Sequence, residues 1–262
     1  MLVATVVAAS QWSPANAALA LFVSLLLQVG VNYSNDYSDG VRGTDNNRVG
    51  PIRLTASGLA PAAAVKRAAF ISFFLASTAG LALAALTSWW VILIGLASIV
   101  AAWRYTGGKN PYGYQGLGDI SVFLFFGVIA TMGTYYVQTL ELTWKIFLVS
   151  IPIGSLSCAL LAINNLRDRG EDEKVGKKTL AVRLGDRASR LYFVVLILSA
   201  YIFVFLTASV WAFITLATLP ISLPLIKSVL RGATGSALIP LLALTGKLQI
   251  LFALTFAVAL AL

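Results

Sequence analysis

Residues 32–39 read Asn32-Tyr33-Ser34-Asn35-Asp36-Tyr37-Ser38-Asp39 and form the first of two acidic clusters. The second cluster follows about 130 residues later and reads Asn164-Asn165-Leu166-Arg167-Asp168-Arg169-Gly170-Glu171-Asp172. The chain around them is apolar, since 59% of its 262 residues are hydrophobic and 11% are charged. An ionised group in such a chain is costly unless it is paired, hydrated or metal-bound. We therefore interpret the two clusters together as the functional site.

The spacing within each cluster is that of one helical face. Asn32 and Asp36 are four residues apart, and Asp36 and Asp39 are three apart. The second cluster contains an i, i+4, i+8 series, formed by Asn164, Asp168 and Asp172. Side chains three or four residues apart lie on the same side of an α-helix. The sequence therefore predicts two helices whose polar faces meet.

The residue types in these clusters favour a hard metal ion. The chain has no histidine and one cysteine, which argues against zinc, copper or iron. Carboxylate and amide oxygens suit Mg²⁺, which usually keeps several waters and shares its other positions between a few carboxylates and the phosphates of a ligand. Two facing aspartate clusters therefore predict a diphosphate bound between them with Mg²⁺.

The composition predicts an all-α polytopic membrane protein with one domain over residues 1–262. Its mean hydropathy is +0.87, and its charged fraction is well below the roughly 25% of soluble domains. Residues 1–9 are too short to cross a membrane, so we expect them to be the second half of a first helix whose start is missing. Apolar runs of about 20 residues place eight further spans near 16–34, 62–86, 88–106, 118–138, 143–165, 190–208, 210–229 and 240–261.

The basic residues predict the orientation of the chain in the membrane. Of the 19 lysines and arginines, 17 fall on the face that carries the acidic clusters, and Lys145 lies opposite. Basic loops stay on the cytoplasmic side, so we expect the site to face the cytoplasm. The net charge of +9 then follows from topology and in part from an anionic substrate, and no nucleic acid is needed to explain it.

Each cluster is expected to close a long helix and to open a polar loop of about 25–30 residues, a length that is usually functional or disordered in a compact domain. The first loop carries Arg48 and Arg53, whose planar guanidinium groups suit phosphate oxygens. The second carries Lys174, Lys177 and Lys178, which suit a departing diphosphate. The two loops are therefore expected to flank the site.

These residues resemble the two aspartate-rich motifs of the UbiA superfamily of membrane prenyltransferases. The likeness lies in Asn35-Asp36-x-x-Asp39 followed by Gly43-Thr44-Asp45, and in Asp168-x-x-x-Asp172 with the tail Gly176-Lys177-x-Thr179-Leu180-Ala181-Val182. The stretches Gly50-Pro51-x-Arg53-Leu54 and Tyr105-Thr106-Gly107-Gly108 are similar to the menaquinone branch of that superfamily. One departure is Gly43, where the first motif often has its last aspartate; Asp45 follows two residues later, and its role is left open.

The resemblance implies nine helices around a central cavity that opens sideways to lipid and is capped on the cytoplasmic side, in the inner membrane. It implies Mg²⁺-dependent transfer of a polyprenyl group from polyprenyl diphosphate to an aromatic acid, for this branch 1,4-dihydroxy-2-naphthoate. Diphosphate and CO2 would leave, and the product would be demethylmenaquinone. Homogentisate and 4-hydroxybenzoate stay open as acceptors.

The resemblance also implies roles for individual residues. The expected metal ligands, direct or through water, are Asn35, Asp36, Asp39, Asp168 and Asp172, with Asn32 and Asn165 supporting them. Arg53, Lys174 and Lys177 are candidates for contacts with the diphosphate or the aromatic carboxylate. Tyr105 and Tyr114 either stabilise an allylic cation with their ring faces or anchor helix ends at the membrane interface. Asp119 either caps the helix that it begins or contacts substrate.

Two other classes of protein fit part of the pattern. A cation-coupled transporter also carries intramembrane acids, but these would lie near the bilayer midplane rather than in basic loops at one face. The CDP-alcohol phosphotransferases share the opening Asp36-x-x-Asp39-Gly40, but they continue Gly-x-x-Ala-Arg where this chain has Val41-Arg42-Gly43. The phosphotransferase motif also keeps its aspartates within one short span, whereas the second cluster here lies about 130 residues away.

Overall fold

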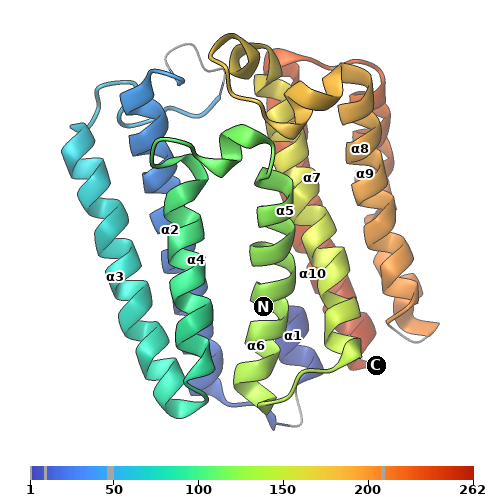
Figure 1. Cartoon of the computed structure of the whole chain (residues 1–262). Coiled ribbons are helices and arrows are strands. Elements are labelled where there is room, and N and C mark those ends of the chain that lie inside the picture. Colours follow the sequence, from blue (N-terminus) through green and yellow to red (C-terminus); the bar gives the residue numbers. More distant parts are fainter. Residues whose placement is uncertain (1, 9–10, 46–49, 208–209) are drawn as a thin grey trace.

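Helices make up nearly all of the computed structural model, which describes residues 2–8, 11–45, 50–207 and 210–262 (Figure 1). Seven segments in these ranges are long and apolar enough to cross a membrane, and α4 is a shorter apolar helix. The N-terminal half contains α1 (Leu2–Val7), α2 (Pro14–Arg42), α3 (Ala62–Leu86), α4 (Trp90–Thr106), η2 (Tyr112–Gln115), α5 (Gly118–Val122), the π-helix η3 (Phe123–Ile129) and α6 (Ala130–Thr139). The C-terminal half contains α7 (Trp144–Lys174), α8 (Leu180–Phe205), η4 (Val210–Thr218), α9 (Leu219–Leu230), η5 (Gly235–Ala237) and α10 (Leu238–Ala261).

Polar side chains cap the starts of α2, α7 and α8, and apolar side chains cover the outer faces of the helices. The Ser13 hydroxyl accepts a hydrogen bond from the Asn16 amide at the start of α2, and Thr143 and Thr179 cap α7 and α8 in the same way. Large apolar side chains such as Phe74 and Trp144 are 70% and 79% exposed. A surface of this kind suits lipid rather than water. The chain is therefore a multi-pass membrane protein.

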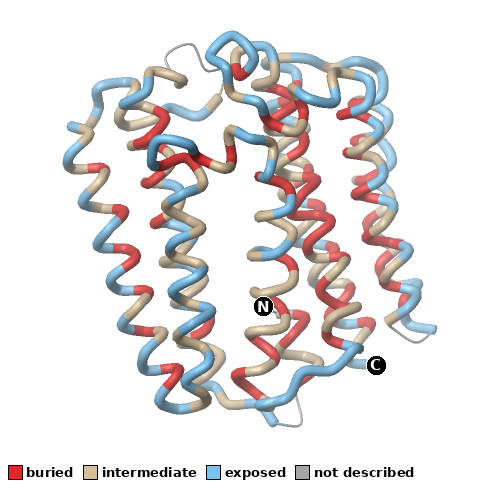
Figure 2. The backbone as a smooth tube through the Cα atoms, in the orientation of Figure 1, coloured by how far each residue is buried: buried red, intermediate tan, exposed pale blue. Residues whose placement is uncertain are grey.

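The helices divide into two groups with space between them. In the first, α2 packs along α3 and α4; in the second, α7 packs along α8, η3 and α10. Figure 2 shows buried residues concentrated along α7, where Leu156, Ile163 and their neighbours form the main hydrophobic core. A small second core joins the groups at the end of the bundle far from the acidic clusters, through Ala20 of α2, Leu83 of α3 and Val137 of α6.

Seven of the eight predicted spans coincide with segments that are long enough to cross a membrane, and the eighth, 88–106, coincides with the shorter helix α4. The bounds differ at the site face. The predicted span 62–86 coincides with α3, but α2 runs on to Arg42 and α7 to Lys174. The predicted long loop after the second cluster is wrong, because α8 begins at Leu180 and leaves only 175–179 as a connection. Residues 171–174 are charged yet favour helix, so α7 continues past the apolar run.

Candidate functional site

A cavity of about 1330 Å³ fills the space between the two groups of helices. It is lined by α2, α3, α4, the α5–α6 span, α7 and α10. One end is polar and contains side chains of both acidic clusters, and the other end reaches Ala20, Leu83 and Val137. The walls between are mostly apolar, so the cavity has the shape and polarity to hold an amphiphile with a charged head and a long apolar tail.

The first cluster lies on the last turns of α2 and turns three of its side chains to the cavity. These are Asn32, Asn35 and Asp39. The side-chain carbonyl of Asn35 accepts a hydrogen bond of 2.8 Å from the Thr106 hydroxyl at the end of α4. The Asp39 carboxylate is buried and accepts a 2.7 Å hydrogen bond from the Tyr114 hydroxyl. The spacing predicted a shared face for Asn32, Asp36 and Asp39; Asn32 and Asp39 line the cavity as predicted, Asn35 joins them, and Asp36 does not.

Asp36 is turned away from the cavity lining toward the connection between α2 and α3. Its two carboxylate oxygens accept hydrogen bonds of 2.8 Å from the backbone amides of Leu54 and Thr55. The residues just before them, Pro51, Ile52 and Arg53, line the polar end of the cavity. Asp36 thus holds the turn that covers that end, and its predicted role as a metal ligand stays a prediction.

The second cluster faces the first from the end of α7. The cavity is lined there by Asn164, Asn165, Asp168, Glu171 and Asp172, which confirms the predicted i, i+4, i+8 face. Asp168 is held by a two-pronged ion pair with the buried Arg167, whose Nε and Nη2 donate over 2.7 and 2.6 Å. The same Nη2 donates to the Asn164 side chain over 2.9 Å. Two facing stripes therefore converge from α2 and α7.

Lys177 joins the two clusters. Its Nζ lies 3.8 Å from a carboxylate oxygen of Asp39 and 3.6 Å from one of Asp172. Burial lowers the pKa of Lys177, but Asp39 and Asp172 outweigh burial and raise the pKa above its ordinary value. Lys177 is therefore a charged ammonium at neutral pH.

Tyr114 lies behind this ion-pair network rather than in the cavity wall. Its ring lies 5.0 Å from Lys177 Nζ and 5.2 Å from the Arg42 guanidinium carbon. Burial, followed by the nearby Asp39 carboxylate, raises the pKa of Tyr114 to about 12. Tyr114 is thus a neutral donor to Asp39. The cavity is lined instead by Tyr105, which stands edge-on to Tyr112 at 5.5 Å.

The remaining predicted residues divide between the site and its surroundings. Arg53 lines the cavity and pairs with Asp45 at 3.4 Å. Lys174 is exposed and pairs with Glu171 at 2.7 Å, so the structure does not bring it to the cavity wall. Asp119 is buried behind the wall, beside Tyr192. Arg48 lies outside the described residues.

Sequence reasoning missed two groups of the site. Arg167 was counted only as a cytoplasmic charge, because neighbours in sequence normally point to different helical faces. Gln28 was also missed, although it precedes Asn32 by four residues and so continues the polar face of α2 into the apolar run. That spacing was the signal that could have found it.

The donor set fits a hard divalent cation. Asp39 and Asp172 both lie within 4 Å of the same ammonium group, so a positive charge is already shared between the two clusters. Their oxygens are of the kind that Mg²⁺ prefers. Among the described residues, no three acidic, histidine or cysteine side chains form a compact metal-binding group, so a metal here would complete its coordination with water and a ligand's phosphates.

The fold and the site together define a class: a multi-pass helical membrane protein with opposed aspartate clusters at the polar end of an apolar cavity. The chain belongs to the UbiA prenyltransferase family, which matches residues 1–238.

Two relatives are named 1,4-dihydroxy-2-naphthoate octaprenyltransferase. The one from Mycobacterium tuberculosis is 46% identical over 94% of this chain and 85% of its own length. The one from Escherichia coli is 37% identical over 94% of this chain and 83% of its own length. A solved UbiA homologue from Archaeoglobus fulgidus bound to DMAPP and Mg²⁺ has a TM-score of 0.64 at 16% identity, over 99% of this chain and 93% of that one. This likeness shows that the fold is shared.

Proposed function

We propose that this protein transfers a polyprenyl group from polyprenyl diphosphate to 1,4-dihydroxy-2-naphthoate. The observation that carries the proposal is that one cavity contains Asp39, Asp168, Asp172 and Lys177 at its polar end and continues between apolar walls into the helix bundle. The two relatives that bear this activity in their names cover nearly the whole chain. Residues 1–262 then act as one membrane-embedded domain, and lipid surrounds it.

The polar end binds the diphosphate. Asp39, Asp168 and Asp172 would hold Mg²⁺ directly or through water, with Asn35 as a further oxygen ligand and with Asn32 and Asn165 beside them. When bound there, Mg²⁺ would neutralise negative charge on the diphosphate and so make it a better leaving group. Asp36 keeps the 51–55 turn over this end, and Arg53 extends from that turn toward the anion.

The residues around the diphosphate favour its departure. Lys177 stabilises the negative charge that builds up as the carbon–oxygen bond breaks. Tyr105 faces the allylic carbon with its ring, which favours positive charge there. The ring carbon that bears the acceptor's carboxylate attacks this allylic carbon. The carboxylate leaves as CO2, and its bonding electrons restore the aromatic ring, which gives demethylmenaquinone in its reduced form.

The test is prenyl transfer in liposomes with radiolabelled polyprenyl diphosphate, 1,4-dihydroxy-2-naphthoate and Mg²⁺. The wild type should form prenylated naphthoquinol, and EDTA should abolish it. Asp39→Asn and Asp172→Asn should each lower the rate about 100-fold or more, since each removes charge stabilisation of the transition state. Glu141→Gln is the matched control, because Glu141 lies exposed in the connection between α6 and α7 at the far face.

The outcomes separate the parts of the proposal. Transfer to homogentisate or 4-hydroxybenzoate, with none to the naphthoate, would keep the mechanism and replace the acceptor. Prenyl transfer that persists without divalent cations would show that the reaction does not need a metal ion. A folded protein that transfers no prenyl group to any of these aromatics would end the prenyltransferase proposal.

A further inference from the structure

Below its charged end, the cavity carries polar side chains that the diphosphate chemistry does not use. They include Gln28 on α2, Ser121 on α5 and the pair Gln249–Ser157 between α10 and α7. Polar groups at membrane depth are costly and usually serve a function. Gln28 lies about three helical turns before Asp39, or about 16 Å along the axis. Asn35, the nearest proposed metal ligand on α2, lies about 10 Å from Gln28 along the same axis. Gln28 therefore lies below the proposed metal ligands of α2.

Ser121 is fixed as a hydrogen-bond acceptor toward the cavity. The Tyr112 hydroxyl lies 2.8 Å from the carbonyl oxygen of Ala101, to which it donates its single proton. It also lies 2.9 Å from Ser121 Oγ, so the proton in that second bond comes from Ser121. The Ser121 oxygen keeps its lone pairs for a partner in the cavity. Its chemistry suits a hydroxyl group that donates.

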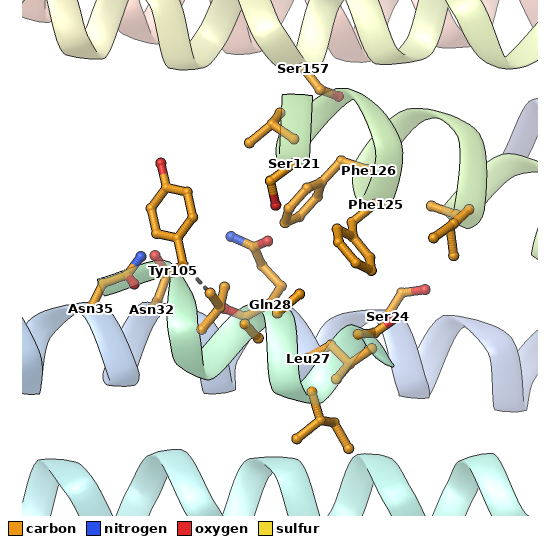
Figure 3. A pocket seen from close by; sticks show the side chains of 18 of the residues that line it. Ser24, Leu27, Gln28, Asn32, Asn35, Tyr105, Ser121, Phe125, Phe126 and Ser157 are labelled. Atoms are coloured by element: carbon orange, nitrogen blue, oxygen red, sulfur yellow. Dashed lines mark hydrogen bonds between the residues drawn. The ribbon is translucent and has the colours of Figure 1, made fainter. Parts of the chain in front are cut away.

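Gln28 faces the same part of the cavity, and its side-chain amide is free to form hydrogen bonds there. Figure 3 shows its amide and the Ser121 hydroxyl directed into the cavity from opposite walls, with Phe125 and Phe126 beside them. Within the described residues, the Gln28 side chain makes no hydrogen bond. An amide offers both a donor and an acceptor. Gln28 and Ser121 can therefore bind one hydroxyl together, next to aromatic rings that cover a flat ligand.

We infer that Gln28 and Ser121 bind the 4-hydroxyl of the aromatic acceptor and so fix which ring carbon meets the prenyl group. The inference rests on the proposed function. The acceptor's carboxylate is an anion, so it is directed toward the charged end with Lys177 and Arg53, and the 4-hydroxyl, which is meta to the carboxylate, is directed down the cavity. A prenyl tail has no hydrogen-bonding group and would leave both side chains unpaired. Ser121 and Gln28 are specificity-determining residues in this arrangement.

The variants that test the inference are Gln28→Met, which keeps length and volume, and Ser121→Ala. Each should raise KM for 1,4-dihydroxy-2-naphthoate about 5- to 10-fold, the loss expected for one hydrogen bond. KM for polyprenyl diphosphate should not change. Ser121→Thr keeps the hydroxyl and should restore the wild-type KM. Ser72→Ala is the control, since it removes a serine hydroxyl that bonds within α3, outside the cavity lining.

A second substrate makes the test independent of the variants' folding. The 4-methoxy analogue of the naphthoate cannot donate, so the wild type should bind it about 5- to 10-fold more weakly, and Ser121→Ala should show no further loss. Equal KM values for the hydroxyl and methoxy acceptors in the wild type would overturn the inference and leave the proposed function intact. An equal rise in KM for the naphthoate and for polyprenyl diphosphate in Gln28→Met would also overturn the inference. A wild type that transfers no prenyl group to the naphthoate would overturn both.

Discussion

At the scale of single residues, Asp36 has a contact that its motif does not reveal. Its carboxylate accepts hydrogen bonds of 2.8 Å from the backbone amides of Leu54 and Thr55. Asp36→Asn replaces one acceptor oxygen with an NH2 group that faces a donor. Leaving a buried donor without a partner costs about 1–3 kcal/mol. We expect amide hydrogen exchange at Leu54 and Thr55 to speed up by about 10-fold or more.

Asp39→Asn is the control for this prediction. It makes the same chemical change on the same helix, but Asp39 contacts Tyr114 and Lys177 rather than the turn. Exchange at Leu54 and Thr55 should therefore stay at the wild-type rate in that variant. Equal exchange rates in Asp36→Asn and the wild type would show that the carboxylate does not hold the turn in solution.

Arg167 supports Asp168 through the geometry of its guanidinium group. Lysine keeps the charge but cannot donate to both carboxylate oxygens and to Asn164 at once. Loss of a group that orients a metal ligand typically costs 10- to 100-fold in metal affinity. Arg167→Lys should therefore raise the half-saturating Mg²⁺ concentration for transfer by about 10-fold or more.

The comparison for this prediction is Arg169→Lys, which makes the same substitution two residues later, outside the cavity lining. Its Mg²⁺ dependence should match that of the wild type. If both variants showed the same Mg²⁺ dependence as the wild type, the two-pronged ion pair between Arg167 and Asp168 would stabilise the fold without influencing metal binding.

At the scale of elements, a close helix contact lies where the π-helix η3 crosses α7. A Cβ atom added at Gly127 would lie 2.5 Å from the Cα of Gly154. Such a clash is with backbone, so the two helices must move apart. Overpacking of this kind costs about 1–3 kcal/mol. Gly127→Ala should lower the unfolding temperature in detergent, while Gly133→Ala in the same span meets nothing within 4 Å and should not.

The elements also show what the sequence could predict. The bounds of α3 were predictable because apolar residues begin and end with the helix. The start of α8 was not, because Thr179 caps a short first segment that ends in a kink at Gly185, and Arg183, Asp186 and Arg187 lie around that kink. A hydropathy window registers those charges as a loop. The stripe Asn164, Asp168 and Asp172 followed from spacing alone, whereas the turn of Asp36 toward Leu54 and Thr55 depends on a loop whose path spacing does not encode.

At the scale of the whole molecule, the basic side chains gather at the end that carries the site. Arg42, Lys109, Lys178 and Arg231 all lie at helix ends or connections on that side, whereas Lys145 begins α7 at the other. Cytoplasmic loops retain such positive charge. We therefore propose that the site faces the cytoplasm of the cell in whose membrane the protein lies.

Single cysteines can test this orientation, because the chain contains only Cys158, which is buried. In intact cells, a membrane-impermeant maleimide should label Glu141→Cys, in the exposed connection between α6 and α7, and should leave Lys109→Cys unlabelled. Opening the membrane should then expose Lys109→Cys, with the wild type as the unlabelled control. The reverse pattern would place the diphosphate site outside. Prenyl diphosphates and the naphthoate would then have to cross the membrane before they could react, which their charge opposes.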